Sequence, residues 1–136
     1  MGVYRVPATL DHIEGILDAI ETEAAEHGFD RVGISRIRLA CEEILVNVAN
    51  YAYHDEVGEV TVTSGPAAGR EGISVAVEDR GIPFDPLAQV PPGTLDLPLS
   101  ERPIGGLGIH LILAVMDEVH YTRDGDKNVL TMVKYR

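Results

Sequence analysis

The chain has 136 residues and a mass of 14.7 kDa, a length typical of one domain, so we expect a single domain over residues 1–136. Its 11 basic and 22 acidic side chains give a formal net charge of −11, which argues against a nucleic-acid partner and against an anionic membrane surface. The first residues lack the basic and then apolar order of a signal peptide, no stretch approaches the ~18 apolar residues of a membrane span, and the single Cys41 excludes an intrachain disulfide. These features predict a cytoplasmic protein that binds neither nucleic acid nor membrane directly.

Apolar residues recur at helical spacing in two stretches of the first half of the chain. After a short β-like segment over residues 3–6, the spacing predicts a first helix that ends near Gly28 and that Asp11 and Glu14 could cap. It predicts a second helix from Ser35 to about Tyr53. The two apolar stripes consist of Ile13, Leu17, Ile20 and Ala24, and of Ile37, Cys41, Ile44 and Val48. The acidic residues of the first helix are interpreted as its solvated face; they include Asp18, Glu21, Glu23 and Glu26.

The second half of the chain alternates between strand-like and helical patterns. Residues 60–63 and 73–78 alternate apolar and polar side chains, which predicts two antiparallel strands joined by a hairpin. A third helix is predicted from Leu107 to about Met116, followed by strands near residues 119–122 and 129–135. Residues 83–103 include six prolines and show little periodicity, which is typical of a long functional loop or lid. This order predicts an α+β fold with helices on one face of a mixed, mostly antiparallel sheet.

A first candidate cluster lies on the second predicted helix. Glu43 and Asn47 are four residues apart and Asn50 is three further on, so an α-helix would place all three on one stripe. A carboxylate can accept a proton, and a carboxamide offers a neutral oxygen to Mg²⁺. A solvated face with an incidental pair would explain the same residues.

A second candidate lies where the strand over residues 73–78 ends, in the segment Asp79-Arg80-Gly81-Ile82-Pro83-Phe84-Asp85-Pro86. A carboxylate at a strand end, followed by a glycine, could meet an amino group of a ligand while the backbone passes close by. A plain turn explains Asp79 and Gly81 equally well.

A third candidate is the glycine cluster Gly105-Gly106-Leu107-Gly108, which opens the third predicted helix. Backbone N–H groups in such a cluster can converge on an anion, and a helix N-terminus adds partial positive charge, so this segment is suited to phosphate. The pattern is not the strand-linked dinucleotide fingerprint, and it lacks the Lys-Ser/Thr ending of a P-loop.

In this order, the three segments resemble the ATP-binding domain shared by gyrase, a heat-shock chaperone, histidine kinases and the mismatch-repair ATPases. The closest likeness is to the stand-alone anti-sigma-factor serine kinases. Their E-x-x-x-N motif is matched by Glu43 to Asn47, their D-x-G-x-P-F-D-P box by Asp79 to Pro86, and their G-G-L-G box by Gly105 to Gly108. The chain departs from the wider superfamily at Pro83, where a second glycine is common, and at Tyr51, where many relatives have a histidine.

The resemblance implies a two-layer α/β sandwich of the Bergerat type, with ATP and Mg²⁺ held between helices and a lid over about residues 84–104. It implies that Glu43 is the general base, that Asn47 coordinates Mg²⁺ and that Asp79 accepts the adenine amino group. The glycines implied to line the base pocket or to contact phosphate are Gly81, Gly106 and Gly108. The remaining residues that it assigns to the ATP site are Asn50, Phe84, Arg102, Gly105 and Leu107, with Arg102 a candidate for the γ-phosphate.

The resemblance also implies a function in a partner switch. The chain would phosphorylate a serine or threonine of an antagonist protein, would sequester a sigma factor, and could form a homodimer. A nucleotide-gated regulatory module without phosphate transfer is the alternative. The catalytic domain of a histidine kinase is a weaker one, because no segment resembles the phosphoacceptor hairpin.

Two further residues are interpreted as structural. Cys41 lies on an apolar stripe, where a small buried thiol is common. His110 is expected to be a half-exposed helix residue, and the five histidines show no zinc-site spacing.

Overall fold

The fold is described from a computed structural model, which covers residues 2–53, 58–83, 85, 87 and 107–136. In chain order the elements are β1 (Gly2–Pro7), α1 (Leu10–Glu26), α2 (Arg31–Asn47), the π-helical turn η1 (Val48–Ala52), β2 (Glu59–Pro66), β3 (Gly72–Asp79), α3 (Leu107–Val115), β4 (Glu118–Asp124) and β5 (Lys127–Tyr135). Within this described part of the chain, no helix is both long and apolar enough to cross a membrane.

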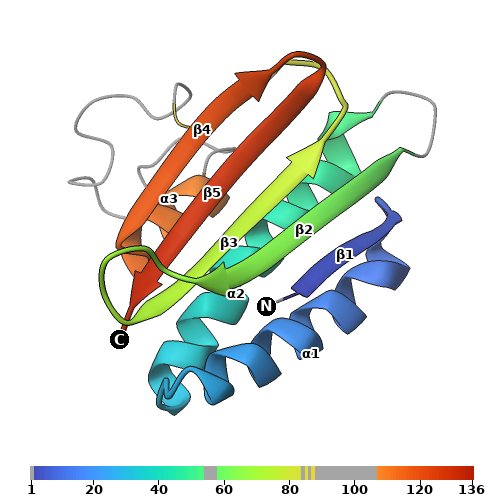
Figure 1. Cartoon of the computed structure of the whole chain (residues 1–136). Coiled ribbons are helices and arrows are strands. Elements are labelled where there is room, and N and C mark those ends of the chain that lie inside the picture. Colours follow the sequence, from blue (N-terminus) through green and yellow to red (C-terminus); the bar gives the residue numbers. More distant parts are fainter. Residues whose placement is uncertain (1, 54–57, 84, 86, 88–106) are drawn as a thin grey trace.

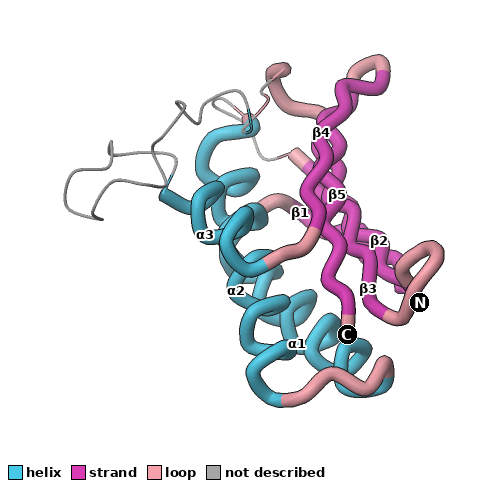
Figure 2. Tube along the Cα trace, turned by 90° about the vertical axis from the view of Figure 1, so that its left-hand side faces the viewer, coloured by secondary structure: helices cyan, strands magenta, loops and turns pink. Residues whose placement is uncertain are grey.

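The strands form one sheet in the order β1-β2-β3-β5-β4, and every pairing among them is antiparallel. The three helices cover one face of this sheet (Figures 1 and 2). The predicted α+β fold in two layers is therefore confirmed, but the described sheet is antiparallel throughout, whereas a mixed sheet was predicted. Strand β4, which follows α3, forms the far edge of the sheet. The last strand, β5, lies between β4 and β3 and pairs with both.

The strand positions follow from the two-residue period of the sequence. In register across the sheet, Val62 of β2 lies opposite Val77 of β3, which lies opposite Leu130 of β5, and all three are buried beneath the helices. The β4–β5 hairpin closes through Gly125, whose φ of 61° lies in the left-handed region that favours glycine. The four strands predicted in this part of the sequence are confirmed, each extended by one or more residues.

Both helix starts differ from the prediction, and a side-chain cap explains the start of α2. Helix α1 begins after Thr9, not at a cap formed by Asp11 and Glu14, and Gly28, with φ of 86°, follows its end as predicted. Helix α2 begins at Arg31, four residues before Ser35, because the Asp30 side chain accepts a hydrogen bond of 2.8 Å from the Gly33 N–H.

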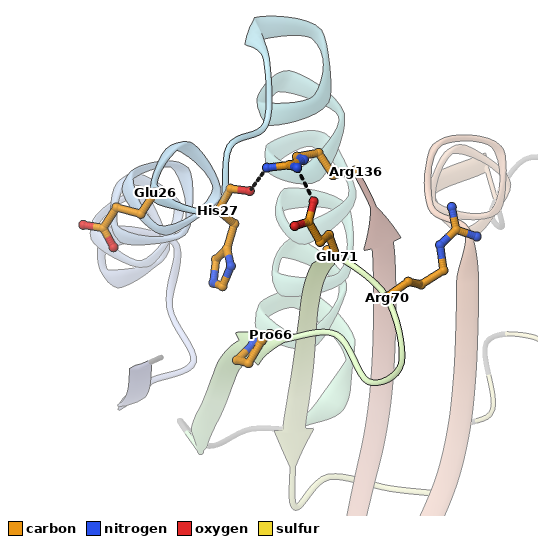
Figure 3. A pocket seen from close by; sticks show the side chains of 7 residues that line it. Glu26, His27, Pro66, Arg70, Glu71 and Arg136 are labelled. Carbon is orange, nitrogen blue, oxygen red and sulfur yellow. Dashed lines mark hydrogen bonds and ion pairs between the residues drawn. The ribbon is translucent and has the colours of Figure 1, made fainter.

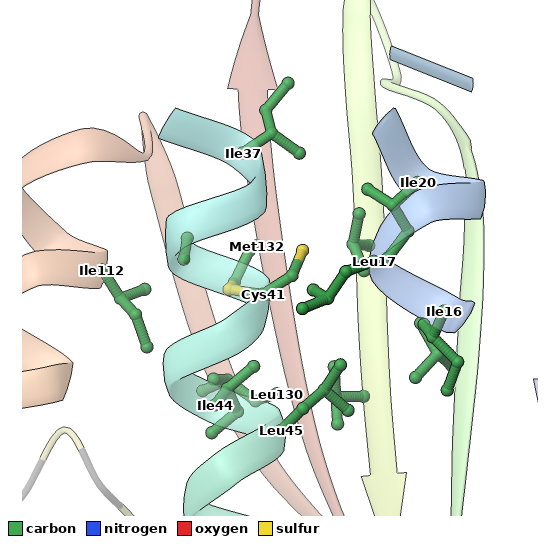
Figure 4. Close-up of a cluster of buried hydrophobic side chains, with 14 of the residues drawn as sticks. Ile16, Leu17, Ile20, Ile37, Cys41, Ile44, Leu45, Ile112, Leu130 and Met132 are labelled. Carbon is green, nitrogen blue, oxygen red and sulfur yellow. The ribbon is translucent and has the colours of Figure 1, made fainter. Parts of the chain in front are cut away.

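The core lies between the helices and the sheet (Figure 4). Side chains from all three helices, among them Leu17 of α1, Leu45 of α2 and Ile112 of α3, form one buried cluster with Met132 of β5. Cys41 is fully buried in this cluster, as predicted, and burial raises the pKa of its thiol to about 12.

One part of the interpretation of helix α1 is wrong. Glu23 is buried, because it follows Ile16 and Ile20 at seven and three residues and therefore shares their face. Asp18 and Glu21 do lie on the outer side of α1, where they pair with the Arg38 guanidinium of α2 at 3.0 and 3.1 Å. These ion pairs raise the pKa of Arg38 and tie the two helices together.

Candidate active site

The helix that carries Glu43 and Asn47 changes its winding directly after them. Helix α2 ends at Asn47, and residues 48–52 form the π-helical turn η1, whereas the sequence predicted one continuous helix to Tyr53. A π-helical turn is rare and is frequently found at functional sites. Glu43 and Asn47 are partly buried on α2, while Asn50 lies on η1 and is exposed.

The first turn of α3 lies against Glu43 and Asn47. A Cβ atom placed on Gly108 would lie 2.8 Å from Glu43 Oε2 and 3.6 Å from Asn47 Nδ2. The first and third candidate segments, 61 residues apart from Asn47 to Gly108, are therefore neighbours in space. A carboxylate, a carboxamide and the positive end of a helix dipole thus meet at one place.

The second candidate segment begins at the end of β3, in the centre of the sheet. Asp79 is buried, with 8% of its surface exposed. Its Oδ1 accepts hydrogen bonds of 2.9 Å from the Gly81 N–H and 2.9 Å from Asn128 Nδ2. Within the described part of the chain both hydrogen bonds to this carboxylate fall on Oδ1, which leaves Oδ2 available to a ligand.

The turn after Asp79 is fastened to η1 by backbone contacts. The Ile82 N–H donates to the carbonyl oxygen of Ala52 at 3.2 Å. A Cβ atom on Gly81 would overlap that same carbonyl oxygen, so the glycine is required by the close approach of two backbone segments. The sequence alone predicts that Gly81 admits a ligand, and the structure adds that it admits the Ala52 backbone.

Tyr53 makes a second link between η1 and this turn. Its hydroxyl accepts a hydrogen bond of 2.8 Å from the Arg80 N–H and donates one of 2.6 Å to the Glu59 carbonyl oxygen. Burial raises the pKa of Tyr53, with the nearby carboxylates adding to the effect, so the phenol keeps the proton that it donates. The helix that carries Asn47 and the strand that carries Asp79 are therefore held in a fixed relation.

The structure adds Asn128 to the surroundings of the site and corrects the expected exposure of His110. Asn128 of β5 lies opposite Asp79 in the strand register and contacts its carboxylate, and no local pattern predicts this contact because the two residues are 49 positions apart. His110 was expected to be half exposed, which is wrong: it has 4% of its surface exposed, and its Nδ1 has no hydrogen-bond partner in the described structure. It lies two residues after Gly108, on a helix whose first turn packs on α2.

The remaining predicted site residues are only partly covered by the structure. Leu107 is the first residue of α3. Most of the predicted lid over residues 84–104 lies outside the described residues, and so do the predicted site residues Phe84, Arg102, Gly105 and Gly106. Their assignments stay predictions.

A surface pocket of about 310 Å³ lies at the opposite end of β3 from Asp79 (Figure 3). It is lined by the end of α1 and the β2–β3 turn, and Arg136 reaches across it to pair with Glu71 and to donate to the His27 carbonyl oxygen at 3.4 Å. Because Gly72 begins β3 and Asp79 ends it, this pocket is separate from the three candidate segments.

Comparison with known proteins places these segments in a family. A sequence model of the histidine kinase-like ATPase domain matches residues 6–134. The chain is 30% identical to the serine-protein kinase RsbW of Bacillus cereus (strain ATCC 10987 / NRS 248) over 134 residues, which cover 96% of this chain and 82% of that protein. It is 29% identical to the serine-protein kinase RsbW of Bacillus anthracis, with the same coverage.

Solved structures share the fold. The structure of the RsbU and RsbW domains of Rv1364c from Mycobacterium tuberculosis superposes with a TM-score of 0.64 at 17% identity, over 99% of this chain and 32% of that one. A histidine kinase domain from Erythrobacter litoralis EL346 superposes with a TM-score of 0.53 at 22% identity, over 95% of this chain and 61% of that one. With the sequence match over nearly its whole length, the chain belongs to the histidine kinase-like ATPase domain family and, within it, to the anti-sigma-factor type of serine-protein kinases.

Proposed function

We propose that the chain binds Mg·ATP between α2, α3 and the turn after β3, and transfers the γ-phosphoryl group to a serine or threonine hydroxyl of an antagonist protein. The observation that carries the proposal is the contact of Gly108 with Glu43 and Asn47, because it assembles a base, a metal ligand and an anion-binding helix end. Phosphoryl transfer relies mainly on positioning and on neutralising charge, and these groups supply both.

The nucleotide is oriented by residues at the two ends of the site. Asp79 Oδ2 accepts the adenine amino group, while the N–H groups at the start of α3 face the phosphates. The carboxamide oxygen of Asn47 would hold Mg²⁺ together with phosphate oxygens, a donor set that this ion commonly takes. When bound, Mg²⁺ would neutralise charge on the phosphates.

Glu43 acts as the general base. The attacking hydroxyl oxygen forms the new O–P bond while the bond from the γ-phosphorus to the bridging oxygen breaks and ADP leaves. The hydroxyl proton goes to the Glu43 carboxylate, which lies beside the first turn of α3. Sigma-factor binding is a further part of the proposal and is supported by the likeness to the RsbW kinases. A homodimer is proposed from the family resemblance of the sequence alone.

A phosphate-transfer assay tests the proposal. The chain is incubated with Mg·ATP labelled at the γ-phosphate and with candidate antagonist proteins, and the label on serine or threonine is measured. Glu43→Gln should lower the rate by about 10²–10⁴-fold while ATP still binds. Glu42→Gln is the matched control, because Glu42 is the preceding residue of α2 and is exposed, and it should transfer phosphate at the normal rate. Equal rates for the two variants would contradict the role of Glu43, and ATP binding with no label on any partner would favour the nucleotide-gated module.

A further inference from the structure

We propose that Asn128 and Tyr121 are positioning residues that fix the Asp79 carboxylate and thereby set the preference of the site for a base with an amino group. This inference rests on the proposed ATP binding and deepens it, because it names the residues that decide which purine is accepted. Neither residue belongs to the three segments that the sequence singled out.

The orientation of the Asn128 side chain follows from its partners. Its Nδ2 lies 2.9 Å from Asp79 Oδ1 and 2.8 Å from the carbonyl oxygen of Ile82. A carbonyl oxygen can only accept a hydrogen bond, and so can an ionised carboxylate, so the amino end of the amide must face this way. Asn128 is 6% exposed, which means that an unsatisfied amide group would be costly here.

Tyr121 holds the amide in that orientation. Its hydroxyl donates to Asn128 Oδ1 at 2.6 Å, from the neighbouring strand β4. An asparagine amide that turns over exchanges its oxygen and nitrogen with almost no change in shape, so packing alone distinguishes the two orientations poorly. In the turned orientation Oδ1 would face the Asp79 carboxylate and the Ile82 carbonyl, and three acceptors would meet.

The consequence for a ligand concerns the second carboxylate oxygen. Asp79 Oδ1 is occupied by the Gly81 N–H and by Asn128 Nδ2, which directs Oδ2 toward a ligand and fixes its angle. A fixed carboxylate accepts a hydrogen bond from the amino group of adenine. It repels the carbonyl oxygen that hypoxanthine carries at the same position, and the site is left with unpaired polar groups. A carboxylate freed from Asn128 could rotate away from that oxygen, so the discrimination would fall.

The test compares ATP with ITP, which differ at this position of the base. Dissociation constants for both nucleotides are measured by calorimetry for the full chain and for the variants Asn128→Ala and Tyr121→Phe. We expect Asn128→Ala to lower the preference for ATP over ITP by about tenfold or more, and Tyr121→Phe by a smaller factor in the same direction. Tyr135→Phe is the matched control, because its hydroxyl bonds Glu118 instead, and it should keep the normal preference.

The outcomes separate the two proposals. A merely structural role would weaken ATP and ITP alike, so an unchanged ratio in Tyr121→Phe and Asn128→Ala would overturn the inference while ATP binding stands. Should Asn128→Ala not fold, the ratio in Tyr121→Phe decides alone. A native chain that binds neither nucleotide would overturn the proposed function and, with it, this inference.

Discussion

Two glycines of the site leave room for different neighbours. Gly81 admits the backbone carbonyl of Ala52, whereas Gly108 admits the end of the Glu43 side chain. The glycine motifs could be found in the sequence because they are local patterns. The reason why each position needs a glycine could not be found in the sequence, because it depends on an atom that lies more than 25 residues away along the chain.

The backbone neighbour of Gly81 predicts a loss of stability when a side chain is added at this position. Backbone atoms cannot move aside as a flexible side chain can, so Gly81→Ala should lower the free energy of unfolding by about 1–3 kcal/mol and weaken ATP binding. Gly15→Ala is the control, because its Cβ would meet nothing within 4 Å on helix α1, and it should be neutral or stabilise the fold by up to about 1 kcal/mol. Urea unfolding measures both changes, and equal stability of the two variants would contradict the close approach of Ala52.

The buried thiol of Cys41 predicts a pH dependence of stability. In the unfolded chain this thiol loses its proton near its ordinary pKa of 9.0, but in the folded chain only near 12, because burial disfavours the thiolate. Between these values the unfolded state binds fewer protons, so the contribution of Cys41 to stability is complete below pH 9 and is lost as the pH rises toward 12.

The comparison with Cys41→Ala isolates this effect from the other groups that titrate in alkali. The difference in unfolding free energy between the wild type and Cys41→Ala should shrink as the pH rises above 9.0, measured by urea titrations at several pH values. A difference that stays constant across this range would mean that the thiol is accessible to water in the folded chain.

At the scale of elements, the sequence predicted the strands better than the helix ends. A two-residue period with valines at 60, 62, 75 and 77 depends only on neighbouring residues, and the strands lie where it placed them. The start of α2 was missed because the capping side chain, Asp30, precedes the first periodic residues. The π-helical turn η1 was missed because its backbone hydrogen bonds span one residue more than those of an α-helix. No local pattern in Val48–Ala52 indicated this difference.

The cap of α2 predicts a measurable loss of stability. Asp30→Ala leaves the Gly33 N–H without its acceptor and should cost about 1 kcal/mol of unfolding free energy, with a lower melting temperature in circular dichroism. Thr9→Ala serves as the comparison, because Thr9 precedes α1 without forming a side-chain cap, and it should change stability less. A larger loss in Thr9→Ala than in Asp30→Ala would show that the two helix starts are wrongly interpreted.

For the whole molecule, the sheet order brings the site together. Asp79 ends the central strand β3, Asn128 lies beside it on β5, and α2 and α3 pack side by side over these strands. The sequence predicted the layers and the residues of the three segments. It could not predict the contacts among them, since Tyr121, Asn128 and Tyr53 act through partners that only the folded sheet places next to them.

A calorimetric titration of the folded chain with ATP, in Mg²⁺ and again in EDTA, tests most directly whether the three segments form one Mg·nucleotide site. The expected result is saturable heat with about one ATP per chain and a weaker affinity in EDTA, because Asn47 and the phosphates hold the ion together. Absence of any heat of binding, in a sample whose cooperative thermal unfolding shows that it is native, would contradict it.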